Sequence, residues 1–174
     1  MTERAVTLKE LLDSRERRVR RQKELLAGHG GILLSITLNI PGPVKDRETY
    51  RRAMEEGVCR LCARLPEGVI LYQELRFPVT GPEGYMCLNA ETLDPLQAKA
   101  IAVETEEADG LGWLLDIDVI TENGGVSRSD LGRPGRRCLL CGEDAKICAR
   151  SQRHPMEQLL AEIERMLEEE LQRP

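Results

Sequence analysis

The chain has 174 residues, which is enough for one domain with a sizeable core, so we expect a single domain over residues 1–174. Hydrophobic residues make up 41% and charged residues 32%, as in an ordinary soluble protein, and one Trp, three Tyr and one Phe leave an aliphatic core. The net charge of −5 argues against a general nucleic-acid binder, because nonspecific affinity comes mainly from Lys and Arg neutralising phosphates.

Neither a secretory signal nor a membrane span is visible in the sequence. The first twenty residues are charged, and the longest apolar stretch, residues 32–38, is far too short to cross a bilayer. We therefore expect a cytoplasmic protein with no membrane partner. In a reducing compartment the six cysteines favour thiols or metal ligands over disulfides.

A capping box formed by Thr7 and Glu10 predicts a helix over about residues 8–27. Its middle is rich in arginine, which has two interpretations: a solvated helix face, or a docking surface for an acidic partner. A second amphipathic helix begins at Pro155 and carries glutamates opposite its apolar face, so it is expected to pack on the body. Its acidic face offers a partner for the basic first helix.

Between these two helices, the sequence predicts a sheet with two helices. The β-branched residues from Ile32 indicate a buried strand, Asp46 is placed to cap the next helix, and the motif GPEG turns a hairpin. The predicted elements are strand 32–40, helix 47–65, strand 69–79, strand 85–90, helix 94–108 closed by Asp109-Gly110, and strand 113–121. This order, βαββαβ over about 31–121, predicts an α+β fold with a ferredoxin-like core. A short strand at 126–129 and a loop at 132–137 follow, and the loop leads into a segment rich in Cys and Arg.

Two carboxylates stand two residues apart in the last core strand. Because side chains alternate along a strand, Asp116 and Asp118 share one face, while Trp113, Leu115, Ile117 and Val119 share the other. Such a pair suits one or two hard cations, as Mg²⁺-dependent phosphoryl transfer requires. A solvated edge strand is the alternative, but the strand is apolar enough to be interior, where unpaired carboxylates are costly.

The segment from Pro41 to Asp46 leads into a predicted helix N-terminus. Backbone N–H groups there and the Lys45 ammonium could take a phosphate, although a turn chosen for its stiffness explains the prolines as well. In a ferredoxin-like sheet the first and fourth strands are antiparallel neighbours. We therefore expect this loop near the start of the strand that carries Asp116, so that the two features form one cleft.

An arginine-rich segment follows the carboxylates. Guanidinium groups suit polyphosphate, with surface solubility as the alternative. Its members are Arg128, Arg133, Arg136, Arg137, Arg150 and Arg153.

The same segment contains three cysteines and a histidine: Cys138, Cys141, Cys148 and His154. The first two have the spacing of zinc ligands, which makes the set a candidate Cys₃His zinc site, but the later intervals are short for a zinc ribbon or finger. Packed thiols with His154 facing a phosphate are the alternative. A second Cys-x-x-C pair, Cys59 and Cys62, falls inside a predicted helix and is interpreted as small core residues.

Together these motifs identify a resemblance over nearly the full length. The chain resembles the citrate lyase holo-[acyl-carrier-protein] synthases, also called apo-citrate lyase phosphoribosyl-dephospho-CoA transferases. The matching pieces are LLDSRERRVRRQ, PGPVKD at 41–46, GPEGYM at 81–86, GWLLDIDVI at 112–120, VSR at 126–128 and RRCLLCGEDAKICARSQRH at 136–154. The last of these is the most specific.

This resemblance implies a nucleotidyltransferase-type reaction. The donor would be 2′-(5″-triphosphoribosyl)-3′-dephospho-CoA and the acceptor a serine hydroxyl on the acyl-carrier subunit of citrate lyase, with diphosphate as the leaving group. By position, Asp116 and Asp118 would hold Mg²⁺, one of them acting as base. The candidates for the triphosphate are Lys45, Arg128, Arg137 and Arg150, with His154 second in line. The basic first helix would dock the acidic carrier subunit.

The Gly-Ser loop that precedes the paired aspartates in polymerase-β-like nucleotidyltransferases is not evident, so that fold is not expected. An alternative from another class is a noncatalytic zinc-containing interaction module built on Cys138, Cys141, Cys148 and His154.

Overall fold

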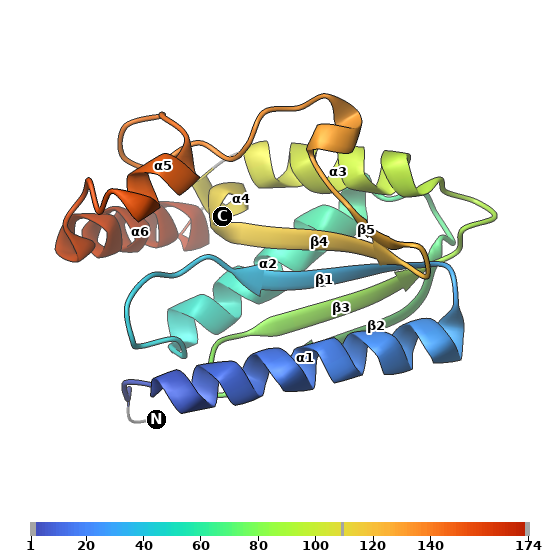
Figure 1. The fold of residues 1–174 in the computed structure, drawn as a ribbon, viewed down its shortest axis with the longest axis horizontal. Helices are drawn as coiled ribbons and strands as arrows, with labels where there is room; N and C mark the ends of the chain where they lie inside the picture. The colour runs from blue at the N-terminus through green and yellow to red at the C-terminus, as the bar shows by residue number, and fades with distance from the viewer. Residues whose placement is uncertain (1–2, 109, 173–174) are drawn as a thin grey trace.

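The computed structural model describes residues 3–108 and 110–172, which form five strands, six α-helices and one short 3₁₀ helix, η1 (Figure 1). In chain order the elements are α1 (Leu8–His29), β1 (Ile32–Leu38), α2 (Glu48–Arg64), β2 (Ile70–Arg76), β3 (Glu83–Leu88), α3 (Pro95–Glu107), α4 (Gly110–Leu114), β4 (Leu115–Thr121), β5 (Gly124–Val126), η1 (Ser129–Leu131), α5 (Ala145–Arg150) and α6 (Met156–Leu171).

All the strands belong to one antiparallel sheet in the order β2-β3-β1-β4-β5. Mixed α/β architecture is thereby confirmed. β1 and β4 run side by side, with Leu38 opposite Leu115 and Leu33 opposite Ile120. Because the pair is antiparallel, the segment after β1 lies beside the start of β4, as predicted. The candidate site described below lies where these two segments meet.

Helices α2 and α3 cover one face of the sheet. Alternate residues of β1, including Ile32, Leu34 and Ile36, point into this layer and are fully buried with Met54 and Leu61 of α2. The core is aliphatic, as the composition predicts, and burying each such side chain stabilises the fold by about 1.5–3 kcal/mol.

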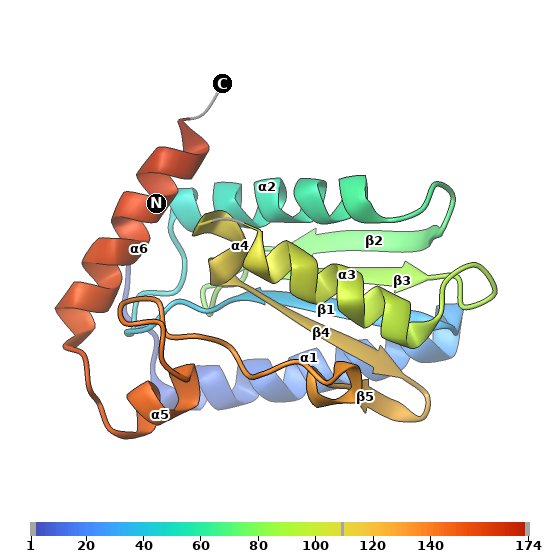
Figure 2. The ribbon, with the colours of Figure 1, turned by 90° about the horizontal axis from the view of Figure 1, so that it is seen from above.

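The long helix α1 covers the opposite face of the sheet (Figures 1 and 2). Leu25 packs there against Leu33, Tyr85 and Cys87. Two arginines on this side reach strand carboxylates: Arg18 Nε lies 3.3 Å from Glu83 Oε1, and Arg21 Nε lies 2.7 Å from Glu74 Oε1. The interpretation of the arginine-rich middle as a solvated helix face therefore does not hold for Arg18 and Arg21.

Helix α6 packs on the body, as predicted, but among residues 3–108 and 110–172 no ion pair joins it to α1. Its buried Ile163 and Leu167 contact Leu111 and Leu114 of α4. Its glutamates reach arginines at and within α2: Arg47 Nη1 lies 2.8 Å from Glu164 Oε1, and Arg60 Nη1 lies 3.1 Å from Glu170 Oε2. The acidic face of α6 thus forms ion pairs with arginines of α2 and its N-cap and, in the described part of the chain, not with those of the basic first helix.

The helix starts are partly as expected. The Thr7–Glu10 capping box is present, and α1 ends at His29 with Gly30 as its C-cap at φ 67°, a conformation that favours glycine. Asp46 does not cap α2. The N-cap position is Arg47, and the Asp46 carboxylate instead makes two 2.7 Å hydrogen bonds with the Arg51 guanidinium.

Other element predictions need correction. Trp113 belongs to the short helix α4 and is exposed, so the strand begins at Leu115 and Trp113 does not share its apolar face. The expected strand 126–129 is β5 at Gly124–Val126 followed by η1. Cys62 packs against the core but Cys59 is exposed. The helix end predicted at Asp109 lies outside the described residues. No helix in the described part of the chain is long and apolar enough to cross a membrane.

Candidate active site

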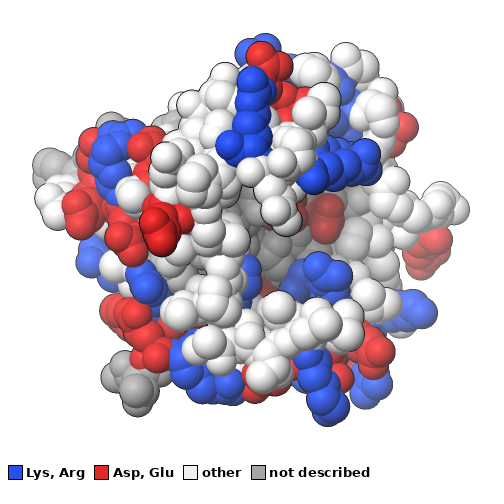
Figure 3. All heavy atoms as spheres, turned by 60° about the vertical axis from the view of Figure 1, so that its left-hand side comes forward, with Lys and Arg blue, Asp and Glu red and all other residues white. Residues whose placement is uncertain are grey.

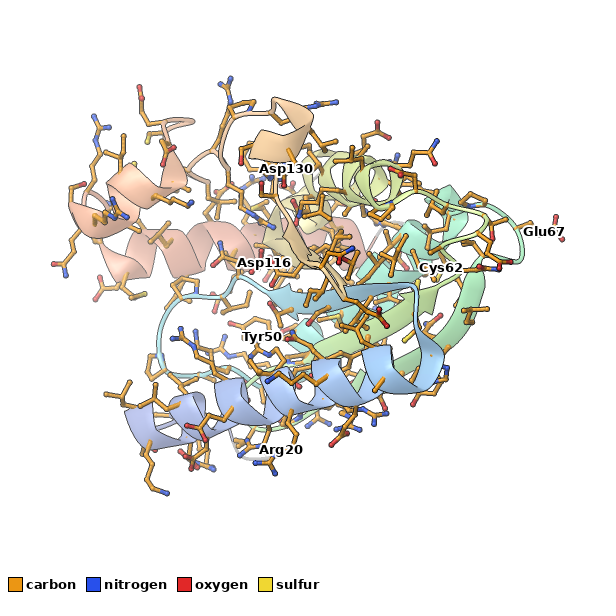
Figure 4. The ribbon with its side chains drawn as sticks, turned by 45° about the vertical axis from the view of Figure 1, so that its right-hand side comes forward. Arg20, Tyr50, Cys62, Glu67, Asp116 and Asp130 are labelled. Carbon is orange, nitrogen blue, oxygen red and sulfur yellow. The ribbon has the colours of Figure 1, made fainter. Side chains whose placement is uncertain are left out.

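The two carboxylates lie on one face of β4, as the alternation predicts. Leu115, Ile117 and Val119 are buried against the core, and Asp116 and Asp118 face the other way, opposite Thr37 and Ser35 of β1. Figure 4 labels Asp116 near the start of β4, with Asp130 above it on the segment after β5. The pair therefore lies on the side of the sheet that α1 covers.

The two side chains differ in their surroundings. Asp116 is 48% exposed, and its Oδ1 lies 3.0 Å from Arg136 Nη2. Asp118 reaches the surface, yet its pKa is raised, first because neighbouring protein atoms exclude part of its solvation and second because Asp116 adds a negative charge. A cation between the two would relieve this repulsion.

A buried carboxylate that the sequence did not single out organises the arginines. Glu106, at the end of α3, is 3% exposed and accepts hydrogen bonds from the backbone N–H of Ile117 at 2.7 Å and from Arg136 Nη2 at 2.5 Å. Arg128 Nη2 donates to its other oxygen, and Arg128 Nη1 lies 2.5 Å from Glu107 Oε1. Glu106 thus ties β4 and the segment after β5 to α3.

A large pocket of about 950 Å³ opens beside this cluster. Its walls come from the segment after β5, from α4 and α5, and from the start of α6. Figure 3 shows the hollow on this side of the molecule, with basic side chains above and below it. The predicted residues Arg128, Arg137 and His154 line it, together with Arg133 and Arg136. A pocket of this size is suited to a ligand as large as a nucleotide cofactor.

The arginines in the pocket differ in how far they are already neutralised. Arg128 and Arg136 are committed to Glu106, and Arg133 lies 3.6 Å from Glu107. Arg137 has no carboxylate within ion-pair distance among residues 3–108 and 110–172. Its guanidinium is therefore the cation in this wall that is most available to a phosphate.

Lys45 and Arg150 lie outside the large pocket. The Lys45 ammonium donates to the carbonyl oxygen of Ile40, and burial lowers its pKa. It lines a smaller pocket of about 190 Å³ between α1 and the end of β1. Asn39 lines both pockets, so the two adjoin. Arg150 is exposed at the end of α5 and lines neither.

The predicted metal-ligand set does come together. The ligand atoms of Cys138, Cys141, Cys148 and His154 all lie within 4.8 Å of one another. This is the one group of three or more such side chains found in the described ranges, and Asp116 and Asp118 of β4 do not belong to it.

Sequence reasoning missed Glu106, and it named Arg136 only as one member of the arginine-rich segment. The signal was the acidic run at 104–107, at the end of the helix that precedes the last core strand, but a glutamate at a helix end is usually solvated. Its burial follows from the packing of α3 on β4, which the sequence does not display. Asn39 was also missed, because an isolated amide after a strand carries no motif.

Comparison with known proteins gives a consistent answer. The family model described as "CitX: Apo-citrate lyase phosphoribosyl-dephospho-CoA transferase" matches residues 6–170. A protein of Escherichia coli O1:K1 / APEC named apo-citrate lyase phosphoribosyl-dephospho-CoA transferase is 40% identical over 166 residues, covering 94% of this chain and 89% of its own.

Two further relatives agree. The protein of that name from Citrobacter koseri is 38% identical over 169 residues, covering 95% of this chain and 91% of its own. A probable transferase of the same name from Streptococcus pyogenes serotype M18 is 36% identical over 168 residues, with 94% and 86% covered. The chain therefore belongs to the family of apo-citrate lyase phosphoribosyl-dephospho-CoA transferases.

Proposed function

We propose that this chain transfers the phosphoribosyl-dephospho-CoA group from 2′-(5″-triphosphoribosyl)-3′-dephospho-CoA to a serine of the acyl-carrier subunit of apo-citrate lyase. Family membership over residues 6–170 is the observation that carries the proposal. The large arginine-lined pocket beside the β4 carboxylates supports it, because the donor is bulky and carries a triphosphate. A noncatalytic zinc module is not favoured, since the relatives are named as transferases over nearly the whole chain.

In the reaction, the serine oxygen attacks the phosphorus nearest the ribose. A new P–O bond forms, the bond from that phosphorus to the bridging oxygen breaks, diphosphate leaves with the electron pair, and the serine proton passes to a base. No covalent enzyme intermediate is needed, so the protein positions the groups and stabilises charge. Arg137 and Arg133 line the pocket wall and are proposed to hold the diphosphate portion.

The two aspartates fit the remaining tasks. Two carboxylates on one face, with the pKa of Asp118 raised first by partial burial and then by the charge of Asp116, are proposed as a set of hard oxygen ligands that favours Mg²⁺. Such an ion would neutralise charge on the phosphate oxygens. When no ion is bound, the raised pKa makes the Asp118 carboxylate a stronger base than an ordinary aspartate, which suits it to act as the general base. An ion at Asp116 would compete with Arg136 for Asp116 Oδ1, so the hydrogen bond from Arg136 would break or the oxygen would be shared.

We propose a ferredoxin-like arrangement for the core. The chain order of strands and helices from β1 to β4 is βαββαβ, and the spatial order β2-β3-β1-β4 supports this arrangement. α1, the Cys- and Arg-rich segment and α6 are additions to it within a single transferase domain. The proposal also keeps the cytoplasmic location expected from the sequence.

The carrier subunit is proposed to dock along α1. Arg15, Arg17 and Arg20 are exposed, and Arg15 lines the small pocket that adjoins the donor pocket. An acidic carrier on this helix would place its serine near β4, where the carboxylates lie. Lys45 lines the same small pocket, so its ammonium is proposed to meet the donor or the carrier at this junction.

The intact mass of the carrier subunit tests the function. The apo subunit is incubated with this chain, the donor and Mg²⁺, and we expect its mass to rise by one phosphoribosyl-dephospho-CoA group. Asp116→Asn and Asp118→Asn should abolish the rise while circular dichroism shows an intact fold. An unchanged carrier mass with the natural chain would contradict the function, and full transfer by both variants would contradict the site.

A further inference from the structure

The Cys- and His-rich group in the wall of the large pocket has the geometry of a metal site. Its four ligand atoms lie within 4.8 Å of one another, with 3.5 Å between Cys141 Sγ and Cys148 Sγ and 3.3 Å between His154 Nε2 and Cys141 Sγ. A disulfide needs about 2.05 Å between sulfurs. Ligands around a tetrahedral zinc with Zn–S of about 2.3 Å are about 3.8 Å apart. The observed spacing is close to the second value.

The chemistry of the set is also specific. Three thiols and an imidazole are soft and borderline ligands, which select zinc over magnesium or calcium. Four protein ligands fill a tetrahedral coordination shell and leave no open position, which is typical of structural zinc and not of catalytic zinc. We propose that Cys138, Cys141, Cys148 and His154 bind one structural Zn²⁺.

The segment that carries these ligands has little else to hold it. Between Gly132 and Pro155 the one regular helix is α5, with six residues, and its Ile147 is 64% exposed. Cys138 and Cys148 are the two buried hydrophobic positions of this stretch, each 5% exposed. A metal that cross-links residues 138 and 154 replaces the core that such a short segment cannot build.

Zinc would also fix the wall of the pocket. Cys138, Cys148 and His154 all line it, and Arg137 immediately precedes the first ligand. The Cys138 N–H donates to Glu143 O at 2.6 Å, and Arg137 forms an isolated bridge with Asp144. The metal therefore orders the turn that presents the Arg137 guanidinium. This last consequence rests on the proposed function, whereas zinc binding itself does not.

Zinc content and coordination test the proposal on the full chain. The protein is purified without chelator from zinc-supplemented medium, and elemental analysis is expected to find about one zinc per chain. X-ray absorption should show three sulfurs at about 2.3 Å and one nitrogen at about 2.0–2.1 Å. Protein without zinc after this preparation, or zinc with an all-oxygen and nitrogen shell, would overturn it.

Two matched cysteine variants locate the metal. Cys141 and Cys59 are both exposed, but only Cys141 belongs to the group. Cys141→Ser should weaken zinc affinity by about 100-fold or more in a competition titration, because it removes a ligand, and Cys59→Ser should leave it unchanged. Equal zinc affinity in the two variants would refute the assignment.

The outcome is separable from the proposed function. Prosthetic-group transfer by a chain that contains no zinc after the zinc-supplemented preparation would overturn the zinc site and leave the transferase standing. Stoichiometric zinc with the expected sulfur coordination, in a chain that does not modify the carrier, would support the site and count against the transferase.

Discussion

Glu106 is the residue on which the arrangement of the site most depends. It is buried, it accepts a backbone hydrogen bond from β4, and it forms ion pairs with both Arg128 and Arg136. Removing one member of a buried ion-pair group leaves the other charges without compensation, which costs more than the pair itself contributes. Glu107, its neighbour, is 45% exposed and contacts Arg128 and Arg133 from the solvent side.

We expect Glu106→Gln to lower the free energy of unfolding by about 3 kcal/mol, because Arg128 and Arg136 lose the charge that compensates them. Glu107→Gln is the matched control and should cost less than about 1 kcal/mol, as exposed pairs do. Urea denaturation of the two variants measures both. Equal losses would show that Glu106 does not have the organising role assigned to it.

For Asp118 we expect the opposite effect on stability, a gain when its charge is removed. Its pKa is raised in the folded protein, so its charged form costs stability at neutral pH, and that cost disappears as pH falls below its ordinary pKa. Asp118→Asn should therefore unfold at a higher urea concentration than the natural chain at pH 7, with a smaller difference near pH 4, even though transfer is lost.

Asp130→Asn provides a control of opposite sign. The pKa of Asp130 is lowered by hydrogen bonds from the backbone and hydroxyl of Ser127, so its stabilisation is present at neutral pH and is lost as pH falls through its folded pKa. Its substitution should lower stability at pH 7. If Asp118→Asn did the same, the repulsion between the β4 carboxylates would be absent from the protein.

Among the elements, α1 carries two kinds of arginine. Arg21 binds Glu74 through two nitrogens, at 2.7 and 3.1 Å, and joins the helix to β2. Arg20, which Figure 4 labels on the side of α1 away from the sheet, is exposed. The helix thus has a structural side and a side available to a partner.

Charge reversal on the outer side tests carrier docking. Arg20→Glu should raise the KM for the carrier subunit by about threefold to tenfold and leave donor affinity unchanged, because a rim charge acts mainly on encounter with an oppositely charged partner. Arg64→Glu, on exposed α2 surface across the sheet, is the control and should leave this KM unchanged. Equal effects of both variants would exclude a docking role for α1.

The sequence predicted the long elements and missed the short helices. Capping at Thr7, the apolar run from Ile32 and the heptad-like spacing in residues 156–171 gave correct elements, because long periodic segments carry a strong signal. Helices α4 and α5 have five and six residues, too few to show a helical period. Their formation depends on tertiary contacts, such as Leu111 and Leu114 against α6.

At the scale of the whole molecule, the sheet places the main hydrophobic core on one side and the candidate active-site carboxylates on the other. One face, under α2 and α3, is an aliphatic core, and the other exposes the β4 carboxylates between α1 and the segment after β5. The positive side chains of the pocket are concentrated there although the net charge is −5. Sequence alone could place the aspartates on one face. It could not show which arginines are already neutralised, because Glu106 comes from another element.

Donor binding measured by titration calorimetry is the most direct test of this site. Arg137→Ala should weaken donor affinity by about tenfold or more, because a guanidinium without a carboxylate partner makes charge-assisted hydrogen bonds to phosphate worth about 1.5–3 kcal/mol. Arg165→Ala, which removes an exposed arginine paired within α6, should bind as the natural chain does. Unchanged donor affinity in Arg137→Ala would contradict the placement of the triphosphate in this pocket.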